Sequence, residues 1–144
     1  MADSKSKRIK LLLKLAQQKC DEAAQQFTQQ LEILEQQTQQ LATLKQYYAD
    51  YEKQFSQFHM RPDELEKART FLAHLQDACS SQERVLEQAQ AQCQRAKEHW
   101  QKEHHRNQAI DDYRLRHQQE QHSLRQKQDQ KLIDEQVMLR YRRN

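Results

Sequence analysis

The sequence predicts an all-α protein, a long antiparallel two-helix coiled-coil hairpin with an overhanging C-terminal helix end. The 144-residue chain contains no glycine and a single proline, Pro62, so helix-breaking residues are confined to one place. On both sides of that proline, apolar residues recur at alternating spacings of three and four, the heptad pattern of a coiled coil. The hydrophobic content is 35% and the mean hydropathy is −1.27, too little apolar material for a core of several packed layers. We therefore expect one coiled-coil domain over residues 1–144.

The first helix is predicted over residues 6–58. One of its apolar spacings is too long, from Phe27 to Leu31, and another is too short, from Leu41 to Leu44. Because the two irregularities cancel, we expect only slight local unwinding and overwinding of the coiled coil. The predicted seam of this helix consists of Ile9, Leu13, Ala16, Cys20, Ala23, Phe27, Leu31, Leu34, Thr38, Leu41, Leu44, Tyr48, Tyr51, Phe55 and Phe58.

The turn is predicted at residues 59–62. Proline in a helix interior costs about 3 kcal/mol, but it is tolerated in the first turn of a new helix, where its missing N–H would be unpaired anyway. Asp63 and Glu66 suit a helix N-terminus and have the spacing of a capping box. We therefore expect the chain to reverse here and the second helix to begin at about residue 63, with Pro62 at the junction between the turn and that helix.

The second helix is predicted over residues 63–140. Its spacings alternate strictly, and Gln82 is the one polar member of a seam made of Leu65, Ala68, Leu72, Leu75, Cys79, Gln82, Leu86, Ala89, Cys93, Ala96 and Trp100. If the turn is centred near residue 60, Ile9 lies opposite about residue 112. We therefore expect residues 113–144 to be an unpaired overhang.

Charge is distributed unevenly along the chain. Residues 1–15 carry five Lys or Arg against Asp3, and residues 113–144 carry eight against four acids, so each segment has a net charge of +4. Since the whole chain is +3, the remaining body is −5. A hairpin brings the two basic segments to the same end.

No pattern of catalytic or metal-binding residues emerges. A helix brings ligands together at spacings of three or four, whereas the neighbouring histidines are one, five or six residues apart: His99, His104, His105, His117 and His122. A chain without glycine has no glycine-rich phosphate loop, and a two-helix rod has no pocket to hold a substrate. We expect no cofactor, no metal, no small-molecule substrate and no enzymatic activity.

Nucleic acid is also not an expected partner. Basic side chains in the C-terminal third could contact phosphates, but acids are interspersed with them and no base-reading module is present. These basic residues are Arg114, Arg116, Arg125, Lys127, Arg140, Arg142 and Arg143.

The N-terminal segment does not resemble a signal peptide or a membrane span. Its apolar run, Leu11 to Leu13, is interrupted by Lys14, far short of the roughly 20 apolar residues that cross a bilayer. Three scattered cysteines suit a reducing compartment. We expect a soluble intracellular protein, monomeric when alone.

The second helix carries apolar residues beside its seam, at Phe71, Ala78 and Val85. Two interpretations remain open. The seam is wide and Phe71 folds over the core, or Phe71, Leu75, Ala78 and Gln82 form an exposed stripe that docks against a partner. Near the C-terminus, an apolar group returns after a polar stretch, and we expect it to bind another protein through Leu132, Ile133, Val137, Leu139 and Arg140.

The order and spacing of five segments resemble the FliJ family of the bacterial flagellar protein export apparatus. These segments are RIKLLLKLAQQKCDEAA, LKQYYADYEKQF, FLAHLQDACSSQ, AKEHWQ and RQKQDQKLIDEQ, which together span nearly the whole chain. The resemblance implies a non-enzymatic antiparallel coiled coil similar to the central stalk of rotary ATPases. It implies binding to the hexameric export ATPase, whose assembly and activity the family promotes.

The resemblance also implies binding to the membrane export-gate protein through the stripe that matches Phe71, Leu75 and Ala78, and a role in recycling export chaperones. At the last stripe position many relatives have histidine, whereas this chain has Gln82. The implied location is the cytoplasm, peripherally at the inner membrane beneath the flagellum. Two alternatives remain: the equivalent stalk of a virulence-type secretion system, and a structural coiled coil that dimerises through its overhang.

Overall fold

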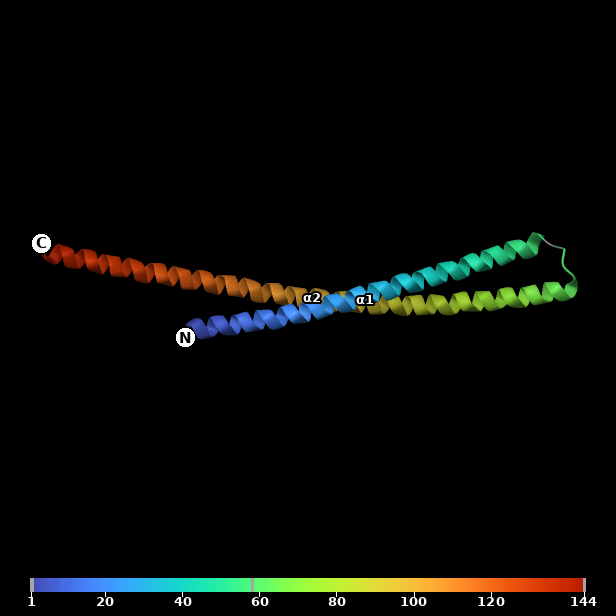
Figure 1. Ribbon diagram of the computed structural model, residues 1–144, viewed down its shortest axis with the longest axis horizontal. Coiled ribbons are helices and arrows are strands. Elements are labelled where there is room, and N and C mark those ends of the chain that lie inside the picture. The colour runs from blue at the N-terminus through green and yellow to red at the C-terminus, as the bar shows by residue number, and fades with distance from the viewer. Residues whose placement is uncertain (1, 58, 144) are drawn as a thin grey trace. The chain divides into compact units, whose positions relative to one another are not determined.

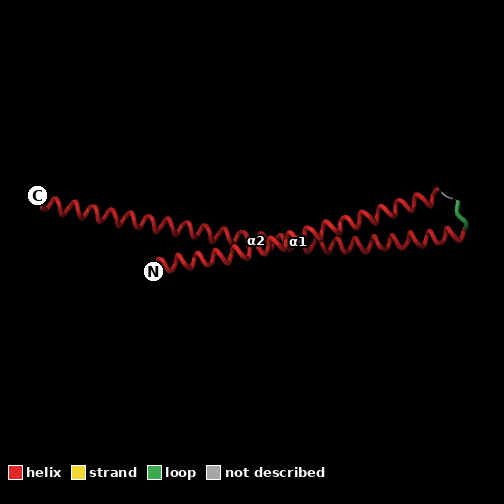
Figure 2. The backbone as a smooth tube through the Cα atoms, viewed as in Figure 1, coloured by secondary structure: helices red, strands yellow, loops and turns green. Residues whose placement is uncertain are grey.

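The computed structural model describes residues 2–57 and 59–143, which form two long helices (Figure 1). Helix α1 spans Ala2–Gln57 and helix α2 spans Pro62–Arg143, with a short loop before α2 (Figure 2). The described residues contain no strand, and the predicted all-α hairpin of two packed helices is confirmed. Helix α1 begins earlier than residue 6, and α2 continues beyond residue 140. Met1, Phe58 and Asn144, which belong to the predicted ranges, lie outside the described residues.

Pro62 begins α2, one residue before the predicted start of that helix. The backbone N–H of Leu65 donates a hydrogen bond of 2.9 Å to the carbonyl of Arg61, so Arg61 occupies the N-cap position and Pro62 follows it as the first helical residue. The expectation of an Asp63–Glu66 capping box was wrong, because that motif needs Asp63 at the N-cap and the structure places it inside the first turn. There the carboxylates of Asp63 and Glu64 still interact favourably with the positive end of the helix dipole.

The chain divides into two compact units, and each combines a segment of α1 with a segment of α2. Unit 1 contains the residues up to Glu22 and those from Gln101 onward, and unit 2 contains Ala23–Trp100. Within both units the helices run antiparallel, since partners of successive α1 residues fall at decreasing numbers on α2.

The core is a thin seam of small apolar residues. Among the residues whose burial the structure describes, the buried apolar ones all occupy seam positions predicted from the heptad spacing: Ile9, Ala16, Cys20, Ala23, Leu41, Ala68, Ala89 and Cys93. No large side chain among the described residues is fully buried, because two helices cannot surround it. In unit 2 the rings of Phe27 and Trp100 meet across the seam with their centroids 6.1 Å apart.

The seam of α1 takes a different path from the predicted one between Phe27 and Leu41. Leu31 and Thr38 are exposed, while Gln30 and Gln37 are half-buried, so placing Leu31 and Thr38 in the seam was wrong. The physical reason is that the helix keeps strict alternation of three and four and accepts glutamines in the seam.

Gln37 is hydrogen-bonded to Gln82, a polar residue of the opposite seam in unit 2. The side-chain amide of Gln82 donates to the carboxamide oxygen of Gln37 at 2.6 Å and lies 3.1 Å from the Gln37 backbone carbonyl. Half-buried amides need such partners, and a polar pair inside an apolar seam favours the one register in which the pair can form.

Unit 1 has a much more polar seam on its α2 side. Apolar residues of α1, such as Ile9 and Ala16, face a stretch of α2 whose seam positions are Glu103, Asn107, Ile110, Arg114, His117 and Gln121. The Asn107 side chain donates to the Gln17 side-chain oxygen at 2.7 Å. By contrast, the Oε2 atom of Glu103 and the Nε2 atom of His117 are buried without a hydrogen-bond partner among the described residues. Such groups lower the stability of a helix pair.

Packing in unit 1 extends further than the overhang prediction allowed. His117 is buried and Gln121 is half-buried, whereas residues 122–143 are all exposed. The overhang therefore begins at residue 122 instead of 113. The early start of α1, at Ala2, supplies the additional partner residues.

We predict that Gln82→Ala lowers the free energy of unfolding by about 1–3 kcal/mol, because it leaves the half-buried amide of Gln37 without its partner. The double variant Gln37→Leu/Gln82→Leu should be as stable as the original chain or more stable. Denaturant unfolding followed by circular dichroism measures both, with Gln90→Ala at an exposed position of α2 as the control. Equal stabilities of Gln82→Ala and Gln90→Ala would contradict the prediction.

We also predict that Glu103→Leu stabilises unit 1, because it removes a buried carboxylate oxygen that has no partner. Removing a penalty of about 1–3 kcal/mol should slow amide hydrogen exchange in residues 101–121 between fivefold and a hundredfold. Glu98→Leu, at an exposed position of the same helix, should leave these rates unchanged. Faster exchange in Glu103→Leu than in the original chain would show that the carboxylate is stabilising.

Candidate functional site

The first candidate surface is the free end of α2. Within residues 122–143, the predicted group Leu132, Ile133, Val137 and Leu139 is between 53% and 60% exposed. At about 100° per residue, these four side chains and Arg140 lie within an arc of about 160° on the helix. Asp134 and Glu135 lie outside that arc. The structure therefore brings all five predicted residues onto one side of the helix, and we call them the C-terminal surface.

Local interactions explain why this segment is helical without a packed partner. The Gln130 side chain donates to Asp134 one turn later at 3.1 Å, and the side chains of His122 and Gln126 are hydrogen-bonded at 3.2 Å. Three arginines, Arg140, Arg142 and Arg143, occupy the last turn and interact favourably with the negative end of the helix dipole. The helix is thus formed locally, and its apolar side chains remain available to another molecule.

The second candidate surface is built around Phe71 in unit 2. The Phe71 ring meets the Tyr51 ring edge-on, with centroids 4.9 Å apart and an interplanar angle of 75°. Phe71 nevertheless remains 43% exposed. Both sequence interpretations therefore describe part of the same geometry, since the ring packs against α1 and also presents a broad apolar face.

The rest of the predicted stripe lies deeper in the hairpin. Leu75 and Ala78 are half-buried, and Gln82 is engaged with Gln37 of the opposite helix. The structure thus brings Phe71, Leu75 and Ala78 to one shoulder of α2 and directs the amide nitrogen of Gln82 toward α1.

Tyr51 is a surface residue that the heptad pattern did not identify. The pattern assigned it to the seam, but it is 37% exposed and contacts both Phe71 and Phe55, whose ring stacks on it at 6.0 Å. A signal was present in the sequence, because Tyr47, Tyr48, Tyr51 and Phe55 are more aromatic side chains than one seam can bury. We call Tyr51, Phe71, Leu75 and Ala78 the aromatic surface.

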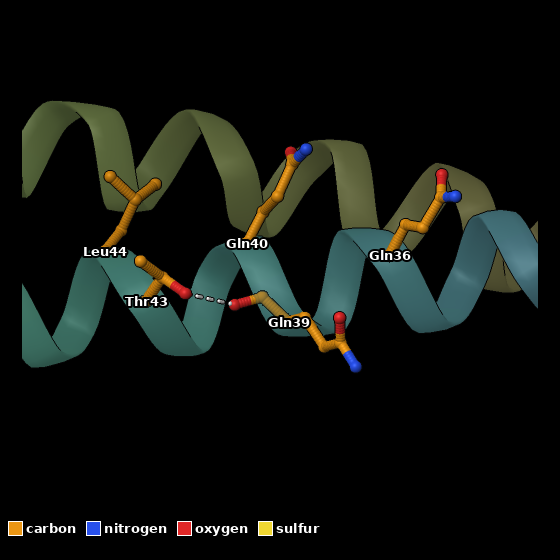
Figure 3. Close-up of a pocket in the computed structure, with 5 residues that line it drawn as sticks. All are labelled: Gln36, Gln39, Gln40, Thr43 and Leu44. Carbon is orange, nitrogen blue, oxygen red and sulfur yellow. Dashed lines mark hydrogen bonds between the residues drawn. The ribbon is translucent and has the colours of Figure 1, made fainter.

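One groove along α1 contains no side chain suited to acid–base catalysis. One open groove in unit 2 is lined by glutamines, Thr43 and Leu44 of α1, and Figure 3 shows Gln40 and Leu44 extending toward α2 while Gln39 points away. The Thr43 hydroxyl donates to the backbone carbonyl of Gln39 at 3.0 Å. Amide side chains do not serve as general acids or bases, and the hydroxyl is already satisfied.

Cysteine and metal chemistry find no arrangement to support them in the described part of the chain. Cys20 and Cys93 are buried, Cys79 is half-buried, and all three are free thiols in the seam, where they pack as small apolar residues. In residues 2–57 and 59–143, no group of three or more His, Cys, Asp or Glu side chains is placed to hold a metal ion. Neither described helix contains a stretch apolar and long enough to cross a membrane.

Comparison with known proteins supplies the family. A family model described as the flagellar FliJ protein matches residues 5–144. Searches of curated proteins and of solved structures found no match. The matched range contains α1 from residue 5 onward, all of α2, the C-terminal surface and the aromatic surface. The chain therefore belongs to the FliJ family, the non-catalytic flagellar proteins that take part in protein export.

Proposed function

We propose that this chain is the stalk-like component of the flagellar export apparatus, and that its C-terminal surface binds the hexameric export ATPase and promotes ATP hydrolysis. The observation that carries the proposal is the unpaired end of α2, where four aliphatic side chains are more than half exposed. Such a group on one helix face is suited to an apolar groove or pore of another protein. Arg140 follows the four aliphatic residues along the chain and lies on the same side of the helix. It adds a cation that can pair with acidic residues of the ATPase ring.

The aromatic surface binds a second partner, the membrane export-gate protein. Phe71 has the properties of an interface anchor, because its ring is oriented by Tyr51 and still exposes a large area. Leu75 and Ala78 add apolar contacts, and Gln82 contributes its remaining hydrogen-bonding capacity at the end of the stripe. The two surfaces belong to different units of the chain, so each can be altered without touching the other.

Family membership supports two further parts of the proposal. Export chaperones are additional partners, delivered back to the apparatus after they release their cargo. A protein that contacts both an export ATPase and a membrane gate works at the cytoplasmic face of the inner membrane, at the base of the flagellum.

We predict that deleting residues 125–144 abolishes stimulation of the purified export ATPase, because the deletion removes the whole C-terminal surface. Substituting Leu132 and Leu139 with glutamine should reduce the stimulation about tenfold or more, because it removes two of the four exposed aliphatic side chains of the C-terminal surface. Phe71→Ala should stimulate hydrolysis normally. Rates measured at increasing protein concentration test this, and unchanged ring binding by the truncated chain would refute the role of the C-terminal surface.

We predict that Phe71→Ala weakens binding to the export-gate protein about tenfold or more, because it removes the best exposed ring of the aromatic surface. Val85→Ala provides a matched control, since Val85 is also a flanking residue of α2 and is 41% exposed. Isothermal titration calorimetry with the soluble part of the gate protein measures both affinities. Equal losses in the two variants would show that the aromatic surface has no specific role.

A further inference from the structure

A third apolar surface lies near the start of α1 and belongs to neither proposed interface. Leu11, Leu12 and Leu15 are 59%, 54% and 47% exposed. At about 100° per residue, they occupy an arc of about 100° centred about 120° away from the seam formed by Ile9, Leu13 and Ala16. This part of α1 therefore has two apolar sides, one packed against α2 and one open, and we call the open side the leucine face.

Cations surround the leucine face. On the helix, Arg8 projects among the leucines, Lys7 and Lys14 border them on one side, and Lys5 borders them on the other. The Lys5 ammonium lies 5.8 Å from the centroid of the Tyr113 ring, which is 46% exposed and so extends the border onto α2. Residues 1–15 contain a single acid, Asp3. The face is thus apolar in its centre and strongly positive at its rim.

Helix stability does not explain this arrangement. Lys5 lies in the first turn of α1, where the positive end of the helix dipole disfavours a cation. The exposed leucines do not pack in the seam. They also do not line the open groove between the helices of unit 1, whose α1 residues include Lys10, Leu13 and Lys14. The lysine is slightly unfavourable at this end of the helix, and the leucines add nothing to the seam, so a bound partner is a physical role that the arrangement fits.

We propose that the leucine face lies flat on the surface of a bilayer that contains anionic lipids. A helix with exposed leucines bordered by lysine and arginine is suited to the boundary between headgroups and acyl chains, where the leucines insert and the long cationic side chains reach the headgroups. Charge complementarity selects the lipid, because each lysine or arginine near an anionic surface strengthens binding about fivefold. This inference requires neither the C-terminal surface nor the aromatic surface, so it stands apart from the proposed function.

The test is sedimentation of the full chain with vesicles of phosphatidylcholine alone or mixed with phosphatidylglycerol. The original chain should bind the mixed vesicles and bind the neutral ones far more weakly. Leu11→Gln/Leu12→Gln/Leu15→Gln should bind the mixed vesicles about tenfold or more weakly, because the insertion of three leucines is lost. Glutamine is a good helix former, and circular dichroism checks that α1 persists in the variant.

Two further variants separate lipid binding from a general loss of apolar surface. Leu31→Gln/Ile33→Gln/Val85→Gln removes three aliphatic side chains of similar exposure from unit 2 and should bind vesicles like the original chain. Lys7→Gln/Arg8→Gln/Lys14→Gln should bind about a hundredfold more weakly, as should the original chain in high salt. The proposal is overturned if the original chain ignores phosphatidylglycerol vesicles, or if the leucine and control variants bind them equally. Loss of ATPase binding in the leucine variant, without vesicle binding by the original chain, would make the face a protein contact.

Discussion

The seam between α1 and α2 is the constraint on which the rest of the structure depends. Two helices can bury only one stripe of each other, so the buried apolar residues are mainly small, and large side chains keep part of their surface in solvent. A core of this kind leaves no enclosed space in which a substrate could be desolvated or a reactive group protected from water. The candidate surfaces of this chain all lie on the outer faces of the helices.

Strict continuation of the seam also decides where polar residues are buried, and it does so in both units. In unit 2, the Gln82 amide donates to Gln37 across the seam, which favours a single register, whereas the Oε1 atom of Gln30 is buried without a hydrogen-bond partner. In unit 1, Glu103 and His117 retain buried atoms without partners. Both units thus keep the alternating pattern at the cost of burying some polar atoms without a partner.

In all three apolar surfaces, the exposed side chains are only partly packed between α1 and α2 or are not packed there at all. Phe71 rests on Tyr51 with much of its ring open, Leu132 lies beyond the last packed residue of α2, and Leu12 lies on the side of α1 away from its partner. A group of exposed apolar residues on one helix face is typical of a binding surface. Membership of the FliJ family connects the chain as a whole with flagellar protein export, and the cations around Leu12 are the observation on which the lipid proposal rests.

The sequence by itself determined the two helices, the reversal at Pro62 and the positions of the apolar residues that are buried in the described part of the chain, because heptad spacing and proline chemistry act within one helix. It also indicated the exposed apolar group near the C-terminus, because that group lies outside the predicted paired region, but it left open whether Phe71 is exposed or folds over the seam. Only the tertiary structure decided that Gln30 and Gln37 replace Leu31 and Thr38 in the seam, that Tyr51 joins Phe71, and that the overhang begins at residue 122. Those features depend on what lies opposite each residue. The pattern of apolar residues along one helix does not show that a glutamine of that helix is hydrogen-bonded to a glutamine of the other.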